Sequence, residues 1–114
     1  MQQLDLPGHE SSQQLKQPKF VKHDENKPRF DLIDADFELE LAQLLEHGAR
    51  KYAPRNWQLA DPDEAVPRYT AALRRHLNAS ARGEVYDNDS GVSHLVCVAC
   101  CSMFLRWFER EATS

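Results

Sequence analysis

The sequence predicts an all-α fold, and three observations support this prediction. Two stretches, ending near residues 51 and 82, carry apolar residues at the three- and four-residue spacing of an amphipathic helix. A third stretch, 92–108, is apolar almost all round, which is typical of a buried helix. No stretch alternates apolar and polar residues for long enough to indicate a strand. We therefore expect a small bundle of three main helices.

Residues 1–26 differ in composition from the rest of the chain. They are rich in Gln, Ser, Lys, Asp and Glu and show no apolar period, so they are expected to form a flexible arm. Residues 27–114 then make up the folded domain. A domain of this size has a hydrophobic core that is only marginally sufficient, so oligomerisation is expected to complete it.

The first helix is expected to follow a short extended or turn-like lead-in at 27–33. Asp34 or Asp36 can cap it, and it runs to about Lys51 before Pro54 ends it. Its apolar stripe comprises Phe37, Leu41, Leu44, Leu45 and Gly48. A loop with three prolines, 53–67, is expected next.

The second helix is predicted from about Glu64 or Arg68 to Arg82, and Gly83 stands where a C-cap glycine is favoured. Its inward stripe is expected to contain Tyr69, Leu73, His76, Leu77 and Ser80. A turn at 84–90 then leads to the third helix, from Gly91 to about Arg110, capped by Asp89 or Ser90. This apolar helix is expected to be the central one.

The three cysteines, Cys97, Cys100 and Cys101, lie within five residues of one another in the third helix. Their odd number and the lack of a distant partner argue against a disulfide framework. Cys97-x-x-Cys100 has the spacing of a metal or redox pair, but a zinc site needs further ligands. Core packing is the favoured interpretation.

Composition excludes several classes of protein. Fourteen Lys and Arg against eighteen Asp and Glu give a net charge of −4, which argues against a general nucleic-acid binder. No apolar run approaches the roughly 20 residues of a membrane span. The first residues lack the basic and apolar regions of a secretion signal, so a cytoplasmic location, without membrane association, is expected.

Two lines of polar residues border the apolar stripes. Glu40, His47 and Lys51 follow one flank of the first helix, and Arg68, Arg75 and Arg82 follow a flank of the second. Residues in such positions lie at the mouth of a groove between helices, where bundle proteins build sites. Each of them singly is as readily explained as a solvated edge residue.

The turn after the second helix is acidic, with Glu84, Asp87 and Asp89 within six residues. Mg²⁺ prefers such oxygen ligands, and a carboxylate on another helix could complete the set. The alternative is that Asp87 and Asp89 cap the third helix. His76 and His94 both lie within apolar stripes, so either hydrogen-bonded core residues or ligands are possible.

Several motifs occur in an order that is typical of one family. They are Lys27-Pro-Arg-Phe-Asp-Leu, Gly48-Ala-Arg-Lys-Tyr52 with Arg55-Asn-Trp57, Tyr69 with Arg75-His-Leu77, Gly83-Glu84 with Asp87, and Ser90-Gly-Val-Ser-His-Leu95 leading to Phe104-Leu105. With these motifs the chain resembles the small phage and prophage dATP/dGTP diphosphohydrolases, a branch of the all-α, MazG-like nucleotide pyrophosphatases. The resemblance runs from Lys27 to about Glu109 and so covers nearly all of the expected folded domain.

The resemblance implies a helical bundle that forms a homodimer or homotetramer. It also implies Mg²⁺-dependent cleavage of a purine deoxynucleoside triphosphate, with Mn²⁺ as a possible substitute, to the monophosphate and pyrophosphate. One feature departs from the wider superfamily, because the usual Glu-x-x-Glu of the first helix is absent. Glu38-Leu-Glu40 and a distant Glu46 stand in its place.

The roles assigned on this basis form a hypothesis about phosphoryl transfer, which depends on positioning and charge neutralisation. Glu40, Glu84 and Asp87 would hold the metal, with Glu40 and His94 as catalytic residues. Lys51, Arg55 and Arg75 would neutralise the triphosphate, with His76 at the same site. Asn56 and Trp57 are candidates for binding the base, although Trp57 is equally a candidate for the core.

A hypothesis of another class remains beside this one. The chain would then be a non-catalytic helical module of phage origin that binds a nucleotide or a protein. An enzyme of the predicted kind loses all turnover with EDTA, whereas a binding module has no turnover to lose.

Overall fold

The computed structural model describes residues 18–114 and contains three α-helices. They are α1 (Ala35–Lys51), α2 (Pro62–Ala81) and α3 (His94–Ala112), with short 3-10 helices at Phe30–Leu32 and Asn56–Leu59. The described residues contain no strand, and their one bridge of strand type joins Tyr86 to Ser93. The all-α prediction is therefore confirmed.

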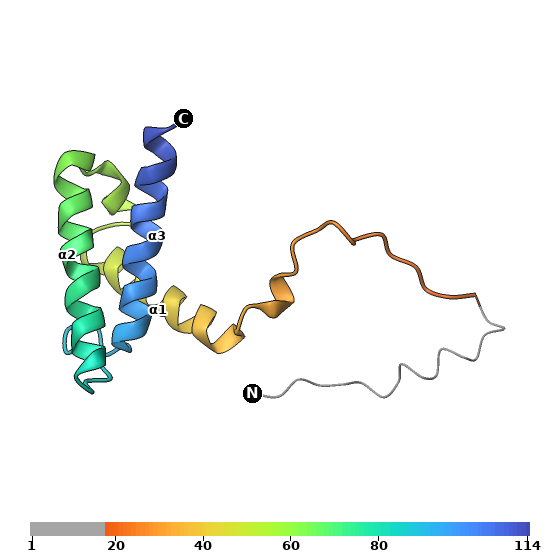
Figure 1. Ribbon diagram of the computed structural model, residues 1–114, viewed down its shortest axis with the longest axis horizontal. Coiled ribbons are helices and arrows are strands. Elements are labelled where there is room, and N and C mark those ends of the chain that lie inside the picture. The colour runs from red at the N-terminus through yellow and green to blue at the C-terminus, as the bar shows by residue number, and fades with distance from the viewer. Residues whose placement is uncertain (1–17) are drawn as a thin grey trace.

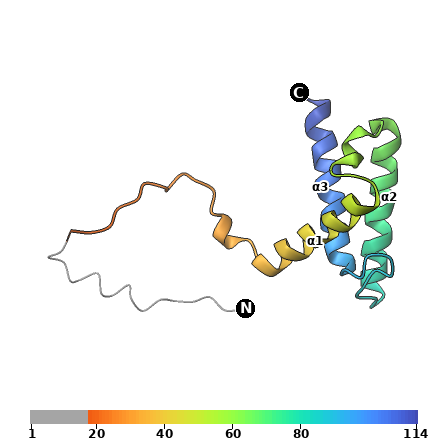
Figure 2. The ribbon, with the colours of Figure 1, turned by 180° about the vertical axis from the view of Figure 1, so that it is seen from behind.

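Helices α2 and α3 lie side by side and antiparallel, and α1 meets the bundle beside α3 (Figures 1 and 2). Helix α3 contains most of the buried side chains, as its continuous apolar sequence predicts. Val96 is the most deeply buried large side chain, at 1% exposure. The three cysteines are buried and free, which confirms their assignment to the core.

Helix α1 differs from the other two in its packing. Its first half projects away from α2 and α3, while its second half contacts the bundle (Figure 1). None of its residues is fully buried, and the predicted apolar stripe is only half-buried. Most of the hydrophobic contact in the described chain therefore lies between α2 and α3.

The helix ends show how local sequence sets the boundaries. Asp34 caps α1 by accepting a hydrogen bond from the Phe37 amide, one of the two caps expected. Gly83 adopts a φ of +95°, its amide donates to the Ser80 carbonyl, and the Glu84 amide donates to the Ala79 carbonyl. This pair of bonds is a Schellman motif, so the predicted glycine C-cap of α2 is confirmed.

Two predicted boundaries were wrong. Helix α2 begins at Pro62, after its N-cap Asp61, and Pro67 lies inside the helix rather than in the preceding loop. Proline at the first helical position costs little, because the amide it lacks would be unpaired there anyway. The start is therefore set by the Asp61-Pro62 pair.

Leu77, expected on the inward stripe of α2, is half exposed at 49%.

Helix α3 begins at His94 with Ser93 as its cap, three residues later than predicted. The segment before it is folded as a hydrogen-bonded loop. The Asp87 amide donates to the Val92 carbonyl and the His94 amide donates to the Val85 carbonyl, each at 2.8 Å. These long-range bonds hold 85–93 outside the helix, so Asp89 and Ser90 do not cap it.

The described residues include no helix that is long and apolar enough to span a membrane. The predicted arm, 1–26, falls largely outside the described part of the chain. Its last residues, 18–26, are exposed and contain no helix or strand.

Candidate functional site

Three polar side chains from three segments meet where the loop between α2 and α3 closes onto the bundle. They are His76 on α2, Asp87 in the loop and His94 at the start of α3, and we call them the His-Asp-His cluster. Each offers one nitrogen or oxygen atom, and these three atoms lie within 4.8 Å of one another. The hydrogen bonds of the loop place Asp87 here, because they fold residues 85–93 back on themselves.

The two histidine rings face one another at close range. Their Nδ1 atoms are 2.8 Å apart, and the ring centroids are separated by 5.1 Å. His94 is buried at 7% exposure and His76 is half-buried. Burial lowers the pKa of His76, and the neighbouring His94 and Arg75 lower it further against the opposing attraction of Asp87. The ring of His76 is therefore held in its neutral form, with a lone pair available.

Asp87 is oriented by Ser90. The Ser90 amide and hydroxyl both donate to the same carboxylate oxygen, Oδ2, at 2.9 and 2.8 Å. Burial raises the pKa of Asp87, but these bonds and the two nearby histidines outweigh burial, so the net pKa lies below its usual value. The cluster thus contains an ionised carboxylate beside two imidazoles.

The last turns of α1 bring two further polar groups to the same loop. Lys51 Nζ lies 3.4 Å from Asp89 Oδ2, and His47 Nε2 lies 3.6 Å from the same oxygen. The second distance is too long for a hydrogen bond. Among the described residues His47 Nε2 is consequently a buried nitrogen without a hydrogen-bond partner. Asp89 is two residues from Asp87, so these contacts attach α1 to the loop that forms the cluster.

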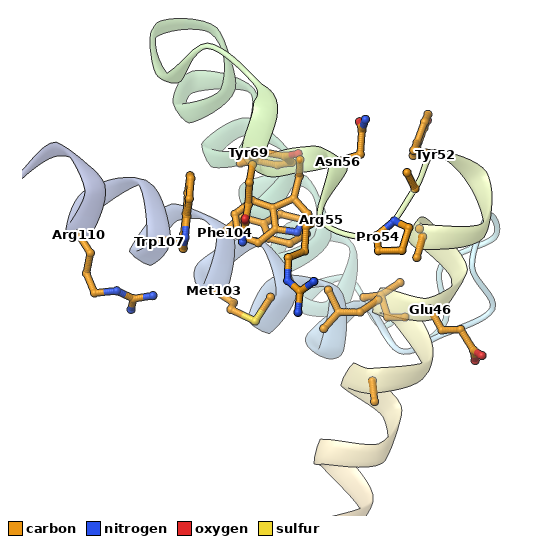
Figure 3. Close-up of a pocket in the computed structure, with 18 residues that line it drawn as sticks. Glu46, Tyr52, Pro54, Arg55, Asn56, Tyr69, Met103, Phe104, Trp107 and Arg110 are labelled. Carbon is orange, nitrogen blue, oxygen red and sulfur yellow. The ribbon is translucent and has the colours of Figure 1, made fainter. Parts of the chain in front are cut away.

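A cavity of about 950 Å³ opens between α1, α3 and the loop at 53–58 (Figure 3). Its wall combines aromatic and apolar side chains with two arginines, Arg55 and Arg110. Trp57 stacks on Phe104 with ring centroids 4.2 Å apart, and Tyr69 lies 4.9 Å from the same ring. Such a surface favours a flat ring together with an anionic group.

The cavity and the His-Asp-His cluster are separated along α3. His94 and Phe104 are ten residues apart in this helix, which corresponds to about 15 Å. The C-terminal turns of α1 lie between the two places: Gly48 and Tyr52 line the cavity, whereas His47 and Lys51 face Asp89.

The structure brings several of the predicted site residues together. Asp87, His94 and His76 share the cluster, and Lys51 contacts Asp89 in the loop that carries Asp87. Arg55, Asn56 and Trp57 line the cavity, with Arg55 directed into it in Figure 3. Trp57 is half-buried in an aromatic cluster, as the core interpretation expected, and it also forms part of the cavity wall.

Other predicted site residues lie apart from these two places. Glu40 is exposed in the projecting half of α1, and Glu84 is paired with Arg82 at 3.0 Å. Within residues 18–114 neither of them joins a group of potential metal ligands. Arg75 is exposed on α2. The carboxylate set Glu40, Glu84 and Asp87 is thus not assembled within one chain, because α1 projects outward before it reaches the bundle.

Sequence reasoning missed two features of the site. It identified His76, Asp87 and His94 separately but gave them different roles, since nothing local indicates that they meet. It also missed the cavity wall formed by Tyr69, Phe104 and Trp107. A signal was present, because these aromatic residues belong to the apolar surfaces of α2 and α3.

The comparisons with known proteins agree with each other. A family model described as "dATP/dGTP diphosphohydrolase, N-terminal" matches residues 17–114. A relative named dATP/dGTP diphosphohydrolase, from Salmonella phage PMBT28, is 31% identical over 87 residues. The alignment covers 76% of this chain but 29% of that relative, so the chain spans under a third of the relative's length. No solved structure matches the chain.

Proposed function

Because the chain belongs to the dATP/dGTP diphosphohydrolase family, whose model matches residues 17–114, we propose that it hydrolyses purine deoxynucleoside triphosphates. The products would be the deoxynucleoside monophosphate and pyrophosphate, and the reaction would adjust the deoxynucleotide pool. The observation that carries this proposal is the aromatic cavity, lined by Arg55 and Asn56, which is joined through α1 to a polar cluster.

The cavity supports binding of the deoxynucleoside part. Trp57 and Tyr69 belong to the aromatic wall that a purine would contact, and the Asn56 amide offers both a donor and an acceptor. Arg55 supplies a guanidinium, which binds phosphate oxygens through two parallel hydrogen bonds. Arg110 supplies a second guanidinium to the cavity wall, whereas Lys51 lies outside the cavity and is paired with Asp89.

A divalent ion in this reaction would neutralise developing charge on the phosphates and activate a water molecule. We propose that the reaction requires such an ion, as the family resemblance suggests. The all-carboxylate set predicted for Mg²⁺ does not fit the geometry of one chain, because only Asp87 of that set belongs to the cluster. No step is therefore assigned to a Mg²⁺ ion held by Glu40, Glu84 and Asp87.

The direct test uses a panel of nucleoside triphosphates with Mg²⁺ or Mn²⁺, with products separated by chromatography. The expected result is dAMP or dGMP plus pyrophosphate, with all turnover lost in EDTA. Release of single phosphate or of intact triphosphate would contradict the proposed reaction. The same assay on Glu40→Gln tests the sequence-based metal set, since turnover equal to wild type removes Glu40 from the mechanism.

A matched pair of arginine variants tests the cavity. Arg55→Ala is expected to lower kcat/KM for dATP by about 10- to 100-fold, the loss expected for charge-assisted hydrogen bonds to phosphate. Arg106→Ala is the control, because Arg106 is exposed and pairs with Glu109 on α3, and neither of these residues lines the cavity. Equal effects of the two substitutions would contradict a specific role for Arg55.

One observation favours a second candidate function, that of a non-catalytic nucleotide-binding module. The matching family model is described as N-terminal, and the chain covers 29% of the phage relative. Such a module would show no turnover with any ion, yet dATP or dGTP would still raise its melting temperature. The product assay and a thermal-shift series therefore separate the two functions.

A further inference from the structure

The His-Asp-His cluster differs in chemistry from a Mg²⁺ site. Two of its three donor groups are imidazoles, whereas Mg²⁺ prefers carboxylates, carbonyls and water. Imidazole suits Fe²⁺, Ni²⁺, Cu²⁺ and Zn²⁺, and in the general order of affinity for such sites Co²⁺ lies between Fe²⁺ and Ni²⁺. Two histidines with one carboxylate, from three separate segments, match the donor set of mononuclear transition-metal centres.

We propose that His76, Asp87 and His94 form a binding site for a single transition-metal ion, such as Co²⁺, Ni²⁺ or Zn²⁺, which excludes Mg²⁺ at equal concentration. The use of this ion in hydrolysis rests on the proposed function, whereas the binding of the ion does not. The binding itself follows from the donor atoms.

The two histidine nitrogens are separated by nearly the distance that two ligands of one metal ion have. Two nitrogens about 2.1 Å from a common ion lie about 3.0 Å apart at adjacent octahedral positions and about 3.4 Å apart at tetrahedral ones. The Nδ1 atoms of His76 and His94 are 2.8 Å apart. They approach one another from different helices, so a small opening of the pair, with a rotation of the rings that turns both lone pairs towards a common point, brings both within bonding distance of one ion.

The carboxylate of Asp87 is held in a fixed orientation by Ser90. Both hydrogen bonds from Ser90 go to Oδ2 of Asp87. Oδ1 of the same carboxylate receives no hydrogen bond from Ser90. The bonds to Oδ2 fix the position of the carboxylate, so Oδ1 is the oxygen that would bind the ion. A ligating carboxylate fixed by a hydrogen-bond donor behind it is the usual arrangement at metal sites.

The cluster offers three ligands to an ion. Three protein groups leave at least one coordination position open, which is typical of catalytic rather than structural ions. Lys51 contacts the same loop at Asp89, two residues from Asp87, so its ammonium group is the nearby cation that would have to leave Asp89 to meet an anionic ligand at the open position. A triphosphate has this charge.

The alternative is a hydrogen bond between the two histidines with no ion involved. One Nδ1 would then carry a proton and donate to the other. This arrangement explains the 2.8 Å contact, and the adjacent carboxylate would then serve only to hold the loop through its bonds from Ser90. The two explanations differ in metal affinity, which is directly measurable.

The experiment titrates chelator-stripped full-length protein with Co²⁺, with its visible absorption as the readout, and repeats the titration with Mg²⁺ in competition. The expected result is one Co²⁺ per chain, with Mg²⁺ at least ten-fold weaker. His76→Gln and Asp87→Asn are expected to weaken Co²⁺ binding at least ten-fold. His23→Gln is the matched control, since His23 is an exposed histidine at 18–26, and it should bind as wild type.

The proposal is overturned if Mg²⁺ competes equally with Co²⁺, or if both cluster variants bind Co²⁺ as tightly as wild type. Should neither variant fold, NMR of the wild type decides: Zn²⁺ should shift the ring signals of His76 and His94 and leave those of His23 unchanged. Shifts in none of these signals would overturn it too.

Hydrolysis is scored separately from binding. Co²⁺ binding with dATP and dGTP left intact counts against the proposed function and supports the site. Hydrolysis by a chain that binds Co²⁺ no better than Mg²⁺ supports the function and counts against the site.

Discussion

Arg55 combines an unusual backbone conformation with a position in the cavity wall. Its φ of 57° and ψ of 22° lie in the left-handed region, and among the described residues it is the only non-glycine with positive φ. A side chain at such a position costs roughly 1–2 kcal/mol. Strained residues cluster at functional sites, where the surrounding structure keeps them in place. The strain at Arg55 is therefore consistent with selection for its guanidinium.

Two substitutions at this position separate strain from binding. Arg55→Gly relieves the left-handed strain and Arg55→Ala keeps it, so the glycine variant should be more stable than the alanine variant by about 1 kcal/mol. Both remove the guanidinium and should lose dATP binding equally. Urea unfolding of the two variants measures the difference in free energy. A glycine variant less stable than the alanine variant would show that the left-handed conformation is not retained in solution.

The buried cysteines should be chemically inert. Burial raises the pKa of Cys100 from 9.0 to about 12 and that of Cys101 to about 11. At pH 8 the shift of Cys100 reduces its reactive thiolate roughly 1,000-fold. Iodoacetamide should therefore label the native chain far more slowly than the urea-unfolded chain, as followed by mass spectrometry. Equal labelling rates would contradict the burial of α3.

The same two thiols should make stability fall at alkaline pH. In the unfolded chain they ionise near pH 9, while the folded chain keeps their protons until about pH 11 to 12. The folded state therefore binds more protons in this range, and the free energy of unfolding decreases as pH rises above about 9. Urea midpoints at pH 8 and pH 10 measure this slope. Cys100→Ala should reduce the slope, and an unchanged slope would exclude Cys100 as its cause.

Single residues were largely identifiable from the sequence, but their grouping was not. The cysteines could be assigned to the core because they lie in a continuous apolar stretch. His76, Asp87 and His94 each stood out by residue type, yet their meeting depends on the loop at 85–93. That loop is fixed by backbone hydrogen bonds between residues up to nine positions apart, such as His94 to Val85. The spacing of apolar residues in the sequence does not indicate such bonds.

At the scale of elements, the three helices differ in how firmly the fold holds their first turns. Ser93 caps α3 by accepting a hydrogen bond from the Leu95 amide, directly beside His94. Asp34 caps α1, whose first half projects from the bundle. Both caps have the same local chemistry, but only the first lies in packed structure.

Removing the two caps should therefore have unequal effects. Ser93→Ala is expected to lower the free energy of unfolding by about 1 kcal/mol, the usual contribution of an N-cap. Asp34→Ala should change it by less than about 0.5 kcal/mol, because the first turns of α1 can fray without disturbing α2 and α3. Urea unfolding followed by circular dichroism measures both. A larger loss for Asp34→Ala than for Ser93→Ala would show that α1 packs in solution more tightly than the structure indicates.

Helix existence was predictable, whereas helix starts were less so. The apolar periods identified all three helices, and Gly83 marked the end of α2 correctly. The start of α2 was misjudged because three prolines suggested a loop. Pro62 is a favoured first residue, and Pro67 lies inside the helix although an interior proline is unfavourable. The start of α3 was misjudged because Asp89 and Ser90 have the residue types of caps but serve the preceding loop.

At the scale of the whole molecule, α1 leaves apolar surface incompletely covered. Its stripe, from Phe37 to Gly48, is half-buried throughout. This is the surface that the expected dimer or tetramer would cover, and we propose a second copy of the chain as its partner. A small core of this kind commonly gains its stability from association.

Association of the chains should be weakened by a charge on the apolar side of α1 and not by a charge on its exposed side. Leu41→Lys places a charge in the half-buried stripe and is expected to shift the protein to the monomer. Gln43→Lys adds the same charge at an exposed position of the same helix and should leave the assembly unchanged. Light scattering coupled to size-exclusion chromatography reports the mass. A wild-type monomer, or equal effects of both variants, would contradict the predicted oligomer.

Tertiary arrangement was the part least accessible from sequence. Periodicity indicates which face of a helix is apolar but not which neighbour covers it. It therefore gave no reason to expect that Glu40 would project from the bundle while Lys51, on the same helix, reaches Asp89. The predicted metal set failed to assemble within one chain for that reason.

The shielding of the three native thiols has a practical consequence. A cysteine introduced at exposed Gln43 would be the fast-reacting one at neutral pH, so a fluorophore can be attached there without first deleting the native cysteines. Trp57 and Trp107 border the cavity and provide natural energy donors. Energy transfer from them to the dye would then report, in real time, whether nucleotide or metal changes the angle between α1 and α3.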